Sequence, residues 1–141
     1  MFNFTKILSR FYLLKQNLKK NIFDLFSHFF IKVYLGALVL LNFLVWFVAS
    51  RIYSQAETPQ IALHYNVDFG IDLYDDVTKI FIIPFLGLLL TIINLIIILL
   101  VNYYQRSEVK FISHILLATA ILANLLLLAA TITIYFINFR G

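Results

Sequence analysis

The side chains with the most potential for chemistry lie in the polar stretch between positions 51 and 79. His64, Asp68 and Asp72 follow one another there at steps of four residues. One histidine and several carboxylates can ligate a divalent cation. Zinc sites favour more Cys or His ligands, however, and calcium loops have denser acidic spacing and a terminal Glu. We therefore expect these residues to form a solvated acidic surface, and we predict neither a metal site nor a cofactor.

A catalytic site would need a nucleophile, a base and an acid that converge on one place. This stretch offers only His64 with its two aspartates. The chain also has no Cys, which excludes disulfides and thiol chemistry. We therefore expect a protein that is not an enzyme and has no catalytic residues.

Apolar and polar residues alternate strictly through the middle of the same stretch. Every odd position from Ile61 to Leu73 is apolar, whereas the even positions include His64, Asn66, Asp68, Gly70 and Asp72. This period of two predicts one short extended segment whose apolar face rests on the helix ends or on the membrane interface. Gly70 would permit a bend or a bulge in that segment.

The elements that position this stretch follow from the composition. Hydrophobic residues make up 62% of the 141 residues and charged residues 13%, against about 45–50% and about 25% in soluble domains. Uncharged runs of 18, 26 and 29 residues separate the charges, and a membrane span needs about 17–25 residues. The sequence predicts an all-α membrane protein with three transmembrane helices at about 33–52, 79–103 and 111–137, and a loop at 53–78.

Pro84 leaves two geometries open for the second span. If the helix begins at Asp75 or Asp76, which are good N-caps, Pro84 leaves the carbonyl of Ile80 unpaired and kinks the helix. If the helix begins near Ile83, Pro84 is a first-turn proline and the helix is straight.

Residues 1–30 show helical periodicity with an apolar face and a basic face. Apolar residues recur at three-, four- or seven-residue steps, and the opposite face includes Lys6, Arg10 and Lys20. Such an amphipathic helix can lie in the headgroup plane and bind anionic lipid. We expect it to anchor the chain on the inner leaflet, and a docking helix for a cytoplasmic partner is the alternative.

The distribution of Lys and Arg sets the expected orientation. Residues 1–32 contain six Lys or Arg against one Asp, and residues 51–79 contain two against five Asp or Glu. Because positive residues favour the cytoplasmic side, the N-terminus is predicted to lie in the cytoplasm and the C-terminus outside a bacterial cytoplasmic membrane. The basic residues flank lipid-embedded spans, so the sequence does not predict nucleic-acid binding.

Each predicted span contains an asparagine away from its ends, and two spans contain stripes of small or polar residues. An amide in hydrocarbon seeks a partner on another helix, and small residues let helices approach closely. We expect these residues to pack inside the bundle or in a dimer interface. They are Asn42, Gly87, Thr91, Asn94, Ala120, Ala123 and Asn124.

A polar translocation path is the functional alternative for these residues. Conduction and proton relay usually use ionisable groups, and the spans have none at mid-depth. His114 lies within a turn of the predicted inner edge, where contact with lipid headgroups is the expected role.

The loop also carries a resemblance to a known group of proteins. The loop contains, in order, Pro59, His64-Tyr65-Asn66, Gly70 and Asp72, and a hydrophobic span follows. This pattern resembles a family of small bacterial membrane proteins of unknown function. Its members have a loop with Pro, then His-aromatic-Asn, then Gly-x-Asp, and some are joined to the immunity domain for a sporulation-delaying toxin. The resemblance covers roughly residues 34–104 and implies signature positions without implying a ligand.

Two functions remain as hypotheses. The first is an integral membrane protein that acts by helix–helix and loop association, in an assembly, accessory, sensing or immunity-like role, with itself or another membrane protein as partner. The alternative is an oligomeric transporter, channel or holin-like subunit, because three helices alone enclose little space.

Overall fold

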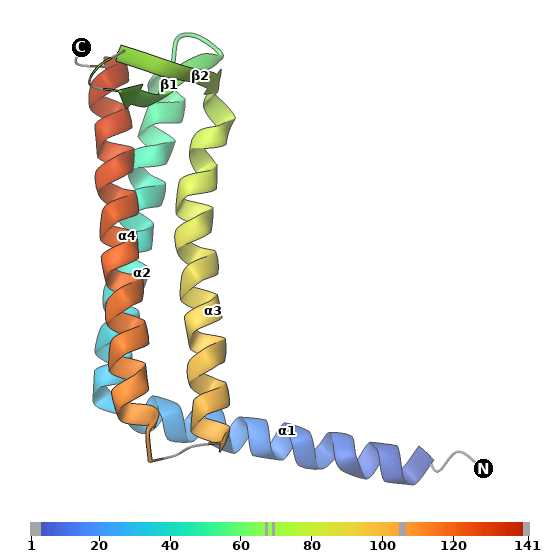
Figure 1. Cartoon of the computed structure of the whole chain (residues 1–141). Helices are drawn as coiled ribbons and strands as arrows, with labels where there is room; N and C mark the ends of the chain where they lie inside the picture. The colour runs from blue at the N-terminus through green and yellow to red at the C-terminus, as the bar shows by residue number, and fades with distance from the viewer. Residues whose placement is uncertain (1–3, 67, 69, 105–106, 140–141) are drawn as a thin grey trace.

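The chain folds into three long helices, a fourth helix that lies across one end of them, and a hairpin that covers the other end (Figure 1). The computed structural model describes residues 4–66, 68, 70–104 and 107–139. The elements are α1 (Phe4–Ser27), α2 (Phe29–Gln55), β1 (Gln60–Asn66), β2 (Gly70–Asp76), the 3₁₀ helix η1 (Val77–Phe81), α3 (Ile82–Tyr104) and α4 (Val109–Phe139).

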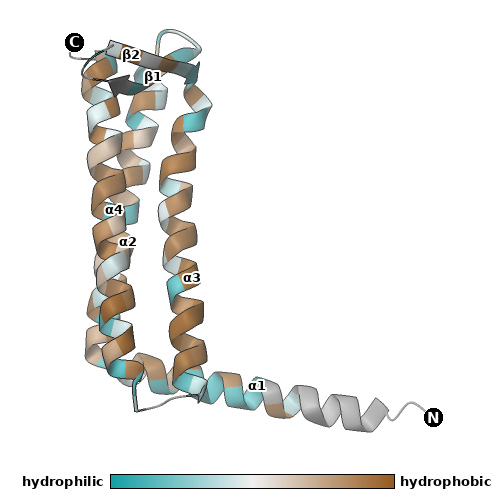
Figure 2. Cartoon of the chain, viewed as in Figure 1, coloured by the Kyte–Doolittle hydropathy of each residue, from teal (hydrophilic) through white to brown (hydrophobic). Residues whose placement is uncertain are grey.

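The three long helices confirm the membrane-spanning fold predicted from the charge-free runs. Three helical segments are each long and apolar enough to cross a membrane: Phe29–Gln55, Val77–Tyr104 and Val109–Phe139. Figure 2 shows that most residues along these helices are hydrophobic. A helix of 27 residues is about 40 Å long, so α2 reaches both interfaces with Lys32 and Arg51 inside its ends. The protein is therefore a multi-pass membrane protein.

The predicted amphipathic helix is α1, which ends at Ser27 and extends sideways from the base of the bundle (Figure 1). The backbone of His28 is extended, with φ −76° and ψ 119°, and this residue separates α1 from α2. Asn21 and Leu25 are buried, whereas Lys19 and Lys20 are exposed. Several large apolar side chains of α1 are exposed as well: Leu18, Ile22, Phe23 and Phe26.

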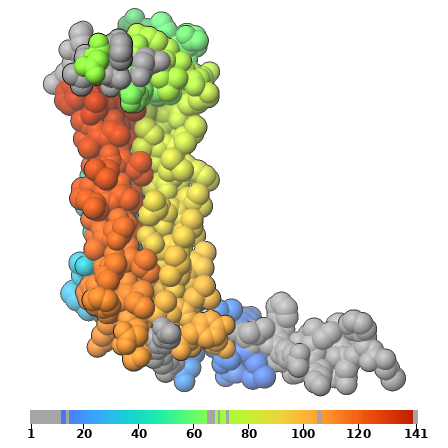
Figure 3. Space-filling view, in the orientation of Figure 1, coloured from blue at the N-terminus to red at the C-terminus, as the bar shows by residue number. Residues whose placement is uncertain are grey.

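α4 packs against both α2 and α3, and Figure 3 shows α3 and α4 in contact along one face of the bundle. The buried residues of α2 recur mostly at steps of seven, as in Ile31, Leu38 and Val45, which is the spacing of a supercoiled helix seam. One apolar cluster lies toward α1, and a second lies toward the hairpin. The helices therefore form a packed bundle that holds the hairpin at one end.

The extended structure predicted over 61–73 is present, and the chain reverses direction within this range. The chain forms two antiparallel strands, β1 and β2, which face each other across a connection at 67–69. Gly70 has φ +78°, a left-handed conformation that side-chain-bearing residues rarely adopt. The reversal at this end of the hairpin depends on that conformation. The alternation of apolar and polar residues does not predict where the chain reverses.

The two geometries considered for Pro84 are combined in the structure. Asp76 caps the 3₁₀ helix η1, and α3 begins directly afterwards at Ile82. Pro84 is therefore a buried first-turn residue of α3, where a missing backbone N–H costs little. Its carbonyl accepts a hydrogen bond from Asn42 Nδ2 at 3.0 Å.

Candidate functional site

The hairpin is attached to the bundle by an apolar contact at the start of β1. Ile61 is buried in a cluster with Ile52 of α2, Ile80 of η1 and Ile134 of α4. β1 is thus the strand that packs on the helices, and it contacts α4 and η1. The apolar face predicted from the alternation rests on the helix ends in this half of the hairpin.

Asn138, near the end of α4, holds the hairpin through two hydrogen bonds to one residue. Its Oδ1 accepts from the Ala62 backbone N–H at 2.9 Å, and its Nδ2 donates to the Ala62 carbonyl at 2.9 Å. The amide therefore occupies the place of a neighbouring strand at the free edge of β1. Its Nδ2 also donates to the Ile134 carbonyl at 2.8 Å, which fixes the side chain on its own helix.

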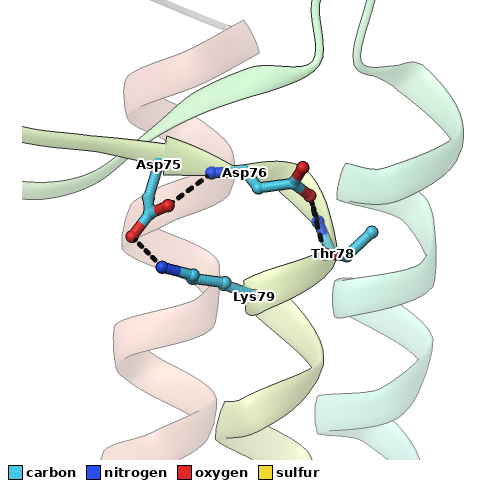
Figure 4. A network of polar contacts seen from close by, with 4 residues as sticks. All are labelled: Asp75, Asp76, Thr78 and Lys79. Carbon is cyan, nitrogen blue, oxygen red and sulfur yellow. Dashed lines mark hydrogen bonds and ion pairs between the residues drawn. The ribbon is translucent and has the colours of Figure 1, made fainter.

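A polar network joins β2 to the following helix (Figure 4). Asp75 accepts from the Asp76 backbone N–H at 2.8 Å and pairs with Lys79 at 2.6 Å. Asp76 accepts from the N–H of Thr78 at 2.8 Å and from its hydroxyl at 2.6 Å. The Lys79 contact lowers the pKa of Asp75, and the Thr78 hydrogen bonds lower the pKa of Asp76. Both carboxylates are therefore ionised near neutral pH.

β2 is the strand farther from the helices, and it presents apolar side chains to the surroundings. Ile71, Leu73 and Tyr74 are 36%, 47% and 58% exposed. Tyr74 is opposite Ala62, whose backbone groups point away from β2 toward Asn138. Opposed residues in an antiparallel pair either exchange both hydrogen bonds or neither. The backbone N–H and C=O of Tyr74 therefore also point away from β1, toward the open edge of the hairpin.

Of the loop residues singled out from the sequence, Pro59 lies at one end of the hairpin and the others lie toward its opposite end. Pro59 precedes β1, and its carbonyl accepts from the Val77 N–H at 2.9 Å. Asp68 and Gly70 lie at the other end of the hairpin, and a strand of seven residues spans about 20 Å. His64 is exposed in the middle of β1. The backbones of Asn66 and Asp72 belong to the strands, and their side chains lie outside the described part of the structure.

The described side chains of the hairpin also bear on the metal site considered for this loop. Within the residues that the structure describes, no three His, Asp or Glu side chains come close enough to hold a metal ion. Pro59 and Gly70 instead occupy the two ends of the hairpin, where they shape its backbone. The hairpin presents an exposed surface at this end of the bundle.

Two of the intramembrane asparagines meet at Gly87. A Cβ placed on Gly87 would lie 2.6 Å from Asn124 Oδ1, 2.9 Å from Asn42 Nδ2 and 3.2 Å from Leu127. Asn42 donates to the Pro84 carbonyl, and Asn124 donates to the Ala120 carbonyl at 2.9 Å. The absent side chain of Gly87 thus leaves room for amides from α2 and α4 between the helices.

The other predicted packing residues also lie in the bundle interior to different extents. Asn94 and Ala120 are buried, and Thr91 and Ala123 are half-buried. The hydroxyl of Thr91 donates to the Gly87 carbonyl at 2.9 Å. Asn124 is fully buried, and its Oδ1 has no hydrogen-bond partner among the described residues. The polar stripes thus face neighbouring helices of the same chain.

Sequence reasoning missed a second amide pair at the base of the bundle. Asn102 of α3 donates to both the side-chain oxygen and the backbone carbonyl of Asn21, and the carbonyl bond measures 3.1 Å. Asn21 Nδ2 donates to the Leu99 carbonyl at 2.9 Å. These bonds fix α1 against the end of α3. The position of Asn102 at the polar end of its span was the only available signal.

His114 has an aromatic neighbourhood that the sequence did not indicate. Its ring stacks on Phe30 with centroids 4.3 Å apart, and it meets the edge of Tyr34 at 5.6 Å. The rings come from α2 and α4, so they join these two helices at the end next to α1. This contact gives the exposed His114 a packing role between α2 and α4, beside the headgroup contact expected from its position.

Comparison with protein-family models, with curated proteins and with solved structures gives no match to this chain.

Proposed function

We propose that this protein is a non-enzymatic integral membrane protein that acts by association through its hairpin. The N-terminus and α1 lie on the cytoplasmic side of a bacterial cytoplasmic membrane, and the hairpin lies outside. α1 rests on the inner leaflet, with its exposed lysines on anionic headgroups and its exposed apolar residues in lipid. The bundle is then the anchor, and the hairpin is the contact surface.

The observation that carries this proposal is the set of exposed apolar side chains on β2. Ile71, Leu73 and Tyr74 are exposed on a hairpin that Ile61 and Asn138 attach to the bundle. Exposed apolar groups rimmed by polar residues are typical of protein–protein contact sites. A surface held in place loses little conformational freedom when a partner binds. These apolar side chains belong to a segment, residues 51–79, in which Asp and Glu outnumber Lys and Arg.

The intramembrane residues favour association over conduction. Asn42 and Asn124 both approach Gly87 within one copy of the chain. Conduction would need polar groups that line a path between copies, and the exposed side chains of the spans are mainly apolar. The immunity-like role implied by the sequence resemblance is one form that association at the hairpin would take.

Site-directed photo-crosslinking in native membranes tests this function. A benzophenone amino acid at Tyr74 should give a discrete crosslinked product, whereas the same group at Tyr104, exposed at the other end of the bundle, should not. Replacing Ile71 and Leu73 by Ser should abolish the product from position 74 without lowering the thermal stability of the bundle. A product that survives this double substitution, or no product at position 74, would contradict the proposal.

A further inference from the structure

A lateral groove lies between α2 and α4 at the hairpin end of the bundle. It has a volume of about 300 Å³ and is lined by Phe47, Val48, Arg51, Ile132, Tyr135 and Phe136. Phe47, Ile132 and Phe136 are also exposed on the surface of the spans. The groove therefore opens toward the bilayer and offers it a largely aromatic and aliphatic wall.

Arg51 supplies the one charged group in this wall. It is exposed, and its guanidinium carbon lies 5.6 Å from the centre of the Phe47 ring. The described residues place no carboxylate within ion-pair distance of it, whereas Lys79, at the same end of the bundle, pairs with Asp75. Arg51 is one helical turn before the end of α2, which puts its charge at the level of the lipid headgroups.

We propose that this groove binds one phospholipid from the leaflet at the hairpin end. The lipid phosphate pairs with Arg51, and an acyl chain lies along Phe47, Val48 and Phe136. Phosphate is the anion that a membrane places at this depth, and the planar guanidinium suits its oxygens. Gln55 also lines the groove and offers an amide to the same headgroup.

The dimensions of the groove agree with this occupant. Ligand pockets span about 300–1,000 Å³, so a groove at the lower end of this range holds part of one chain. Aromatic side chains near the interface also suit a molecule with an apolar tail and a polar head. A bound lipid would cover the α2–α4 seam beside the hairpin.

Native mass spectrometry of the full chain in mild detergent tests the proposal. Titration with phosphatidylglycerol should give a one-to-one complex, and diacylglycerol with the same chains should bind at least fivefold more weakly. Arg51→Gln should weaken phosphatidylglycerol binding about fivefold, and Arg51→Lys should keep most of it. Lys110→Gln, at the α1 end of the bundle, is the matched control and should leave binding unchanged.

A second variant tests the groove without removing the charge. Val48→Trp fills the space for the acyl chain and should lower phosphatidylglycerol binding by a similar factor while Arg51 stays in place. Equal binding by wild type and Arg51→Gln, or equal binding of the two lipids, would overturn the proposal. Competition by millimolar inorganic phosphate would assign the site to free phosphate instead, and a bound second copy of the chain would assign the groove to protein.

Discussion

Gly87 is the residue on which the middle of the bundle depends most. Two amides and Leu127 occupy the space that its side chain would need. Those amides cannot simply turn aside, because Asn42 bonds to the Pro84 carbonyl and Asn124 to the Ala120 carbonyl. Loss of such a bond in a membrane interior costs about 0.6–2 kcal/mol.

Gly87→Ala should therefore destabilise the bundle by about 1–3 kcal/mol, the usual cost of overpacking a core. Thermal unfolding in detergent measures the effect. Gly36→Ala is the matched control, since a Cβ at Gly36 meets nothing within 4 Å. Equal melting temperatures for the two variants would show that the close approach at Gly87 has no energetic consequence.

The carboxylates of Asp75 and Asp76 give the hairpin junction a defined pH dependence. Their hydrogen bonds lower the pKa of both groups below the ordinary value of about 3.9. Each therefore stabilises the junction above that value, and this stability is lost as the pH falls through the lowered pKa. The single tryptophan, Trp46, stacks on Phe81 of η1 and reports the position of that element.

Trp46 fluorescence should stay constant between about pH 5 and pH 8 and change below about pH 4, where these carboxylates become protonated. Replacing both aspartates by Asn should remove most of this acid transition. A transition near pH 6, or an unaltered transition in the double variant, would place its origin elsewhere.

At this scale the sequence singled out Asn42, Gly87 and Asn124, but it did not indicate which groups they meet. The need of an amide for a partner in hydrocarbon marks Asn42 and Asn124 in any apolar run. Their approach to Gly87 depends on how three helices are rotated about their axes. That rotation cannot be predicted from one sequence. Asn138, like Asn124, is an asparagine in the apolar sequence of α4. Its partner, however, is the backbone of Ala62 in β1, 76 residues away.

Among the elements, the hairpin is the one whose attachment can be tested directly. Asn138 forms two hydrogen bonds with Ala62, and Ile61 beside it is buried. The alternating pattern of 61–73 predicted extended structure, and this was correct for both strands. It could not predict the reversal, because a period of two continues unchanged through the connection between strands.

Asn138→Leu should loosen β1 and leave the spans intact. The two lost bonds are each worth about 0.5–1.5 kcal/mol, so amide exchange in residues 60–66 should accelerate by about tenfold. Thr133→Val is the control, because the Thr133 hydroxyl donates to the Ala129 carbonyl of its own helix. Unchanged exchange in the hairpin would mean that Ile61 alone holds it.

The placement of α1 rests on a comparable pair of amides at the opposite end. Asn21 and Asn102 are both buried, and Asn102 donates to two oxygens of Asn21. Amphipathic periodicity predicted the helix itself. The contact with α3 depends on where the chain bends at His28, and no residue there carries a strong breaking signal such as Gly or Pro.

Asn102→Leu should free α1 from the base of the bundle, since it leaves the side-chain oxygen of Asn21 buried without the donor that Asn102 supplies. Spin labels at Lys20 and Glu108 would report this as a broader distance distribution in the variant. The control is Asn94→Leu, on the same helix but away from α1. An unchanged distribution for Asn102→Leu would show that Leu25 alone fixes α1.

For the whole molecule, the composition already dictates the architecture. Three apolar runs predicted three spans, and each one is present as a long helix. The structure adds that α1 and the hairpin lie at opposite ends of the bundle (Figure 1). Two surfaces with different chemistry therefore face opposite sides of the membrane, and the proposed association at the hairpin depends on this separation.

Labelling of single cysteines tests the central claim most directly, because the natural chain has none. An impermeant maleimide applied to intact cells should label Thr58→Cys beside the hairpin and should label Ser107→Cys only after permeabilisation. Leu122→Cys, exposed to lipid within α4, should resist labelling in both conditions. Equal labelling of Thr58→Cys and Ser107→Cys in intact cells would contradict the account.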